Sequence, residues 1–168
     1  IITYLLQPGD IINQKMGASS EINYDPLVQH GIIVAKNDMV KTMISKNSST
    51  NLSLNEFGGS RRRSATGLGY GLYMTMLYFD YNEQEMTTNP SWRKDYAAKY
   101  CLDYSVFEDS KTYDDWYLPS LGEVSLMYDN KNEIGGFGQA NYWTSTEYDT
   151  DQAYAFNFIN GSPFVPLK

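Results

Sequence analysis

Residues 142–148, Tyr-Trp-Thr-Ser-Thr-Glu-Tyr, place Ser145 between two threonines and two positions before Glu147. A serine in such a cluster becomes a nucleophile only when a neighbouring base activates it. The only histidine of the chain is His30, and no serine stands in a Gly-x-Ser-x-Gly motif. We therefore predict that Ser145 is not catalytic and that the chain is not an enzyme.

The carboxylates of Glu147, Asp149 and Asp151 alternate along a turn-prone stretch and could offer oxygen ligands to Ca²⁺. No EF-hand loop surrounds them, and alternating acids at a strand end are also common on a solvated face. One histidine and one cysteine are too few for the usual zinc sites. We predict neither a metal nor another cofactor, with calcium kept as an alternative.

The single cysteine, Cys101, falls at a core-facing position of a predicted helix, so we expect a buried and inert thiol. The glycines of 67–71, Gly-Leu-Gly-Tyr-Gly, have the spacing of a phosphate-binding loop. The residues before them, however, do not form the strand that such a loop requires. We predict a tight turn there.

Charge and aromatic content narrow the class of partner. The net charge of −7 disfavours nucleic acid, which needs a basic face. Arg61, Arg62 and Arg63 form the single basic cluster; they either bind an anionic ligand or lie solvated at a loop tip. Fifteen tyrosines suit a contact surface, because tyrosine combines a large ring with a polar tip, although a sheet with half-buried edges would use tyrosine as freely.

These residues must be positioned by a fold that we predict to be α+β, in a single domain over residues 1–168. Within 2–12 we expect a short strand, a turn and a second apolar step. A polar loop should follow over 14–29, and a further strand is expected within 30–38. Residues 47–71 are expected to form a long irregular loop. Residues 72–82 are apolar enough for either a strand or a short helix. Two strands, 142–149 and 153–161, should pair as a hairpin, followed by an edge segment interrupted by proline. No run approaches the length of a membrane span.

Two helices are predicted from capping residues and periodicity. In 89–104, Asn89 would cap, Pro90 would take the first turn, and one face would carry Ala97, Ala98, Cys101 and Tyr104. In 118–130, Ser120 and Glu123 have the spacing of a capping box, and Leu121, Val124, Met127 and Tyr128 repeat at helical spacing.

The stretch Trp116-Tyr-Leu118-Pro119-Ser120-x-x-Glu123-Val124, followed by 142–148 and by the aromatic strand 154–161, resembles a bacterial family. That family, once a domain of unknown function, is named after the C-terminal domain of the Lcl collagen-like adhesin. The resemblance is specific over 92–161 and loose before it. It implies a C-type-lectin-like fold: two helices flanking a small, mostly antiparallel sheet with a long irregular region.

The resemblance also implies an exported bacterial binding module, secreted or on the cell surface, that carries out no reaction. The ligand would be a glycan or a host or matrix protein. The fold also occurs in formylglycine-generating oxidases, but these use two cysteines and this chain has one. A hypervariable receptor written by a diversity-generating retroelement remains an alternative, as does a structural tip of a surface assembly. The calcium-binding triplet of true lectins is absent.

We expect the ligand to contact the C-terminal hairpin and the 47–71 loop, since recognition residues gather on loops held by a rigid sheet. The candidate contacts are Thr146, Tyr148, Asp149, Asp151, Asn157, Arg61, Arg62 and Arg63. Trp116, Pro119, Ser120, Glu123 and Trp143 are expected to be structural. Strand alternation should bury Trp143, Ser145 and Glu147, with hydrogen bonds to the two polar side chains, and expose the face of Thr146 and Tyr148.

Overall fold

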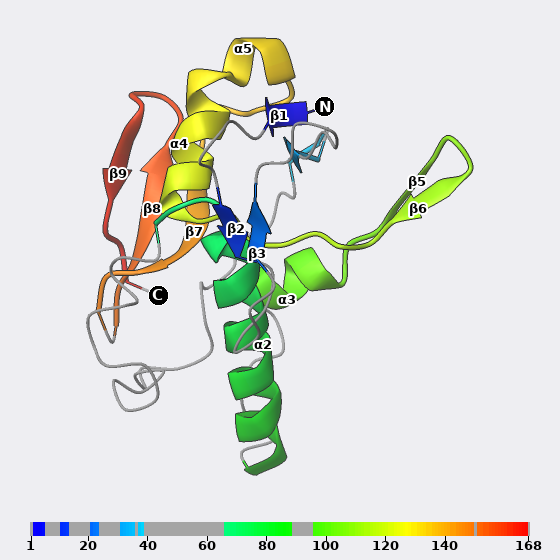
Figure 1. Ribbon diagram of the computed structural model, residues 1–168. Coiled ribbons are helices and arrows are strands. Elements are labelled where there is room, and N and C mark those ends of the chain that lie inside the picture. Colours follow the sequence, from blue (N-terminus) through cyan, green and yellow to red (C-terminus); the bar gives the residue numbers. More distant parts are fainter. Residues whose placement is uncertain are drawn as a thin grey trace.

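A computed structural model describes residues 2–5, 11–13, 21–23, 31–35, 37–38, 66–88, 96–149 and 151–167. These residues form an α+β structure of helices and small antiparallel sheets, as predicted (Figure 1). In the N-terminal part, β1 (Ile2–Leu5) pairs with β4 (Gly31–Ile33) and β2 (Ile11–Asn13) pairs with β3 (Glu21–Asn23). Strand β3 lies where we expected only loop, because three residues are too few to show a period in the sequence.

The longest of the described helices is α2 (Tyr70–Thr88), which resolves the ambiguity of residues 72–82 in favour of helix. Met74, Leu77 and Tyr78 are buried, and Asn82 continues this stripe one turn later. This spacing of three and four residues is that of one helix face. The expected irregular loop was wrong at its end, since residues 70 and 71 belong to α2; residues 47–65 lie outside the described part.

Helix α3 (Ala97–Leu102) is shorter than predicted. Tyr96 has an extended backbone, with φ −135 and ψ 154, so no helix runs through it from the proposed start at Pro90. Asn89 and Pro90 themselves lie outside the described residues. Ala97, Ala98 and Cys101 are buried as expected, whereas Tyr104 follows the helix and is only half-buried.

Helix α4 (Leu121–Asp129) begins at the predicted capping box: the Ser120 side chain accepts from the Glu123 N–H, and the Glu123 side chain accepts from the Ser120 N–H. Helix α5 (Lys131–Ile134) follows directly. Val124 then packs against Phe156 and Phe158 of the sheet, with Leu121, Met127 and Tyr128 around them. The second predicted helix is therefore confirmed in both its start and its buried face.

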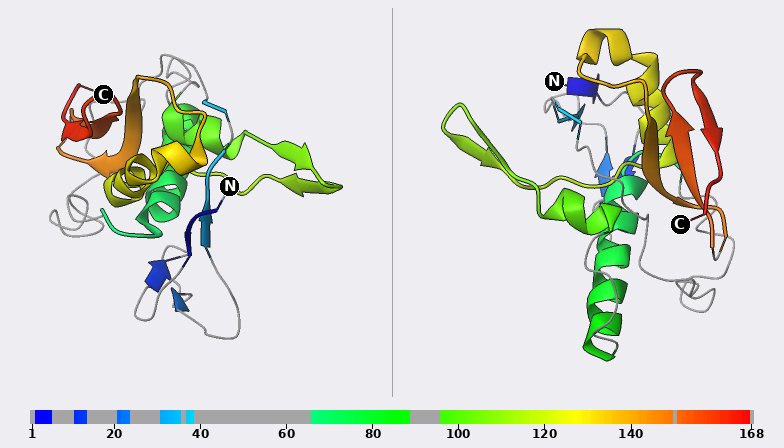
Figure 2. Two further views of the ribbon diagram at one scale, coloured as in Figure 1. Left: turned by 90° about the horizontal axis from the view of Figure 1, so that it is seen from above. Right: turned by 180° about the vertical axis from the view of Figure 1, so that it is seen from behind.

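The C-terminal sheet has the order β7 (Asn141–Glu147), β8 (Ala153–Asn157), β9 (Ser162–Phe164), with antiparallel neighbours. The predicted hairpin and its proline-containing edge strand are confirmed, but the second strand ends at Asn157. Residues 158–161, which we predicted as strand, form the turn to β9. Helix α4 contacts β7 and β8, and α2 contacts β7. Strands β5 (Val106–Glu108) and β6 (Lys111–Tyr113), which we did not predict, form a separate hairpin that projects away from the helices in all views (Figures 1 and 2).

Candidate functional site

The middle of β7 is buried on both sides, which simple strand alternation did not predict. Thr144, Ser145, Thr146 and Glu147 are each at most 4% exposed. The pairing with β8 is irregular between Trp143 and Glu147, and the Thr144 hydroxyl donates to the Tyr154 carbonyl within this irregular stretch. Since α2 and α4 both contact β7, neither face of its centre remains for solvent.

The predicted ligand contact at Thr146 is therefore wrong. Its side chain is fully buried, and its hydroxyl oxygen accepts a hydrogen bond from the Leu121 N–H at 2.9 Å, at the start of α4. Next to it, the Ser145 N–H donates to the Pro119 carbonyl at 2.8 Å. The Tyr78 hydroxyl of α2 donates to the Ser145 carbonyl at 3.1 Å. This part of β7 joins the two helices and is a structural element.

The Ser145 hydroxyl itself has no hydrogen-bond partner among the described residues, contrary to the bond that we expected. It is completely buried, and its backbone hydrogen bonds go to Pro119 and Tyr78 rather than to a basic side chain. Among the described residues no base is hydrogen-bonded to this hydroxyl, and its burial keeps it from solvent. His30, the only candidate base in the sequence, lies outside the described residues.

Glu123 is the other buried polar centre. Its carboxylate accepts from the N–H groups of Ser120 and Gly69, both at 2.7 Å, and from the Tyr117 hydroxyl at 3.3 Å. Burial raises the pKa of Glu123 above its ordinary value, while these donated hydrogen bonds act in the opposite direction. The residue ties the turn before α2 to the start of α4, so the structural role predicted for it agrees with its contacts.

The remaining predicted structural residues contribute packing and backbone contacts. Trp143, which we expected to be buried, is half-buried and packs against Ala97, Cys101 and Leu118. The Trp116 ring nitrogen donates to the Tyr113 carbonyl at 2.9 Å. Cys101 is buried, and this burial raises the pKa of its thiol to about 12, so the thiol stays protonated and unreactive at neutral pH.

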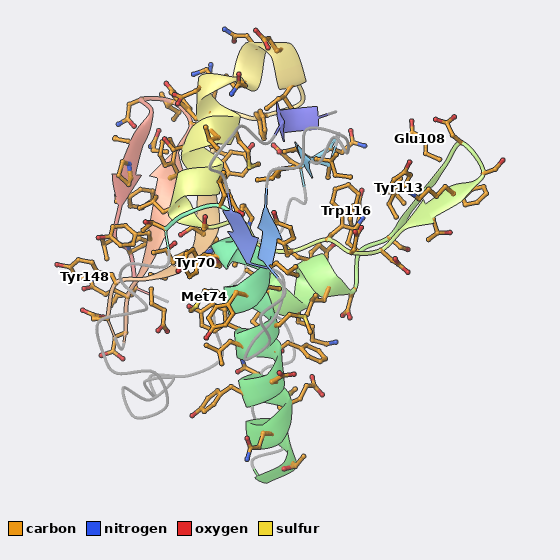
Figure 3. All side chains as sticks on the ribbon, in the orientation of Figure 1. Tyr70, Met74, Glu108, Tyr113, Trp116 and Tyr148 are labelled. Carbon is orange, nitrogen blue, oxygen red and sulfur yellow. The ribbon has the colours of Figure 1, made fainter. Side chains whose placement is uncertain are left out.

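Three predicted contacts do come together, at the connection between β7 and β8. We call Tyr148, Asp149, Asp151 and Tyr154 the turn surface. The Tyr148 ring is 39% exposed and stands edge-on to the Tyr154 ring, with centroids 5.6 Å apart. Figure 3 shows Tyr148 at the end of the hairpin, far from Trp116. Aromatic pairs of this geometry stabilise each other while one ring remains accessible.

Asp149 holds the turn in shape. Its Oδ1 atom accepts from the N–H groups of Asp151 and Gln152, at 2.9 and 2.8 Å. The Gln152 carbonyl in turn accepts from the N–H groups of Tyr148 and Asp149. The side chain of Gln152 donates to the Val165 carbonyl at 3.4 Å, which brings the C-terminal segment beside the turn. Asp151 is exposed.

Asn157 does not join this group. It lies at the other end of β8, about 13 Å along the strand from Ala153 at the usual rise per residue. Its Oδ1 atom accepts from the N–H groups of Ile159 and Asn160, so the side chain stabilises the turn toward β9. We therefore assign Asn157 a structural role. Arg61, Arg62 and Arg63 lie outside the described residues.

Across the described ranges, no three His, Cys, Asp or Glu side chains gather closely enough to hold a metal ion. The alternating acidic residues Glu147 and Asp151 do not share one environment, because Glu147 is buried in β7 whereas Asp151 is exposed to solvent. None of the described helices is both long and apolar enough to cross a membrane.

Sequence reasoning missed Thr75 of α2, which is fully buried. Its hydroxyl donates to the Gly71 carbonyl at 2.8 Å and accepts from the Leu118 N–H at 3.0 Å. A polar residue within the buried stripe of a helix is a signal for such a contact, but the partner 43 positions away is visible only in three dimensions.

Comparisons with protein-family models, with curated proteins and with solved structures found no match.

Proposed function

We propose that this chain is a non-enzymatic binding module with a C-type-lectin-like fold, which recognises a glycan through the turn surface. The observation that carries the proposal is the accessible Tyr148 ring, which stands edge-on to Tyr154 and next to Asp149, whose side chain accepts from the Asp151 N–H. An aromatic ring offers contact area to the apolar face of a sugar, and carboxylates accept hydrogen bonds from its hydroxyl groups.

The character of the turn surface favours a neutral or amino sugar over an anionic one. Asp149 and Asp151 would repel sulfate or carboxylate, whereas an ammonium group would be attracted to them. The arginine triplet at 61–63 would instead favour an anionic sugar. The two possibilities therefore predict different ligands and depend on different residues.

We also propose that the chain is part of a secreted or cell-surface protein of a bacterium. This part of the proposal rests on the resemblance of 92–161 to the adhesin domain family.

A retroelement-type receptor needs variable positions on its surface. The hydroxyl run 144–146 is buried and offers none, so this alternative would depend on exposed positions such as Tyr148 and Asp151. A protein ligand at the turn surface, or a role as a structural tip, would appear as outcomes of the following test.

The test is a glycan array and a set of immobilised matrix proteins, probed with the wild-type chain and with Tyr148→Ala, Asp151→Asn and a triple Arg61→Ser, Arg62→Ser, Arg63→Ser variant. We expect Tyr148→Ala to weaken glycan binding on the order of tenfold or more, as loss of a central aromatic contact does. Phe107→Ala is the matched control, because it removes an exposed aromatic ring elsewhere. Binding that depends on the arginines but not on Tyr148 would contradict the proposed site.

A further inference from the structure

The β5–β6 hairpin, which we call the arm, is built to project. Its strands pair Val106 with Tyr113 and Glu108 with Lys111 around the two-residue turn of Asp109 and Ser110. Both turn residues have left-handed φ angles, 52 and 62, the conformation of the tight turns that match the twist of a hairpin. In Figures 1 and 2 the arm points away from the helices and from the C-terminal sheet.

The base of the arm is anchored to the rest of the chain. Trp116 donates to the Tyr113 carbonyl at the end of β6, and its ring packs against the Tyr104 ring with centroids 5.7 Å apart. Within the arm, the Lys111 ammonium lies over the Tyr113 ring, 4.8 Å from its centroid. The labelled Glu108, Tyr113 and Trp116 side chains follow this order from tip to base in Figure 3. The arm therefore has a defined direction.

The arm also has open surface. The Phe107 ring is 74% exposed, the highest value among the large apolar side chains of the described residues. Within the described part, the sheet contains two strands, so both of its edges are unpaired. A two-stranded hairpin is only marginally stable in water, and a third strand with an apolar face stabilises it.

Register indicates which backbone groups face outward. In a hairpin with a two-residue loop, the pair that flanks the loop is bonded within the ladder. Hydrogen-bonded and non-bonded pairs then alternate, so the N–H and C=O groups of Phe107 and Thr112 point to the edges. Phe107 thus offers both a free edge and an apolar side chain at one position.

Charge identifies the kind of partner. The arm and the segment after it carry four carboxylates, Glu108, Asp109, Asp114 and Asp115, against the single ammonium of Lys111. A second copy would bring the same excess of negative charge, in a chain whose net charge is already −7. A basic partner is complementary.

We propose that the arm is a docking element that accepts an extended, basic strand of a partner protein along its free edge, with Phe107 as the apolar contact. This mode of recognition takes its affinity from main-chain hydrogen bonds and its specificity from side chains. The arm lies on the other side of the molecule from Tyr148, so this interaction is separate from the proposed glycan site (Figure 3).

The probe is a synthetic eight-residue peptide of alternating valine and lysine, titrated into the ¹⁵N-labelled chain and followed by NMR. We expect shifts concentrated at the amides of 106–113 and weakened by salt. Two control peptides test charge and main-chain hydrogen bonding separately: one alternates valine and glutamate, and the other alternates valine and lysine but has a methyl group on every amide nitrogen. Neither should bind, because the first has the wrong charge and the second cannot form the ladder.

Variants of the chain complete the test. Phe107→Ala and the pair Asp114→Asn, Asp115→Asn should each weaken peptide binding on the order of fivefold to tenfold. Tyr148→Ala should leave peptide binding unchanged while weakening glycan binding, so failure of one proposal is distinguishable from failure of the other. Equal binding of the methylated peptide, or shifts confined to other parts of the chain, would overturn the docking role. Arm shifts that depend on protein concentration without peptide would identify a second copy instead and also overturn it.

Discussion

Glu123 shows how a single residue connects distant parts of this chain. It is 2% exposed, and its two oxygens accept from the N–H groups of Ser120 and Gly69, which are far apart in sequence. The carboxylate thus completes the capping box of α4 and satisfies a backbone donor of the turn before α2. Both N–H groups would otherwise be left without this partner in the interior, which is costly.

We predict that Glu123→Gln lowers the free energy of unfolding by about 1–3 kcal/mol, the usual cost of an unsatisfied buried polar group. The side-chain amide replaces one accepting oxygen with a donor, which then faces the N–H of Ser120 or Gly69. Urea denaturation measures the change, with Glu133→Gln on the exposed side of α5 as the matched control. Equal stability of the two variants would show that the hydrogen bonds of Glu123 are not important.

The free energy of unfolding of the wild type and of Glu123→Gln, compared at several pH values, gives a second readout of the role of Glu123. Burial raises the pKa of Glu123 in the folded state, so its contribution to stability is fully present below the unfolded pKa of about 4.3 and falls as pH rises through the folded pKa. The glutamine variant lacks this titration. We therefore expect the stability advantage of the wild type to shrink as pH rises from 4 in urea denaturations. An advantage that grows with pH would mean that the donated hydrogen bonds outweigh burial.

At the scale of elements, α2 approaches the segment before α4 so closely that only a glycine fits between them. A Cβ atom on Gly71 would overlap the Glu123 carboxylate and would lie 2.7 Å from the Tyr117 ring and 2.9 Å from the Leu118 carbonyl. Thr75, one turn later, bonds to this same segment. The glycine allows the close approach that lets Thr75 and Glu123 reach their partners.

We predict that Gly71→Ala destabilises the fold by about 1–3 kcal/mol, the typical cost of overpacking a core. The sign of this stability change is informative, because alanine in a helix is ordinarily more favourable than glycine by about 1 kcal/mol. Thermal unfolding followed by circular dichroism measures the change. Met76→Ala, at an exposed position of α2, is the control and should have little effect. A Gly71→Ala variant more stable than the wild type would contradict the close packing.

At the scale of the whole molecule, stabilising contacts are unevenly distributed. Helices α2 and α4 both contact β7, and Phe156 of β8 packs together with Phe158 against Val124 of α4. The arm, by contrast, is held chiefly at its base by Trp116. The molecule therefore combines a packed centre with two exposed regions, the turn surface and the arm, on different sides (Figure 3).

Hydrogen exchange should follow this distribution. We expect the amides of Ser145 and Val124 to exchange slowly, through openings that approach global unfolding, and those of β5 and β6 to exchange through local opening at little cost. Mass spectrometry of peptides from the labelled chain measures both in one experiment, and the Val-Lys peptide should slow exchange in the arm. Arm amides as protected as those of β7 in the free chain would contradict this assignment.

Local signals were sufficient where short-range chemistry decides the conformation. The capping box of Ser120 and Glu123, the helical period that buries Val124 and the paired strands β7 and β8 are all present in the structure. Each depends on residues within a few positions of one another or on a regular period. The same signals were insufficient for 72–82, where apolar residues on every side hide the helical period, and for the short strands β3, β5 and β6.

The sequence by itself determined the α+β class, the start of α4 and the place of the C-terminal hairpin, because capping and periodicity act locally. Only the tertiary structure decided that Thr146 is buried, that Asn157 stabilises a turn and that Tyr148, Asp149 and Asp151 share one surface. The reason is that burial of a strand face depends on what packs against it, and here α2 and α4 cover both sides of β7. Alternation predicts two faces, but the contacts made by distant elements decide whether either face meets solvent.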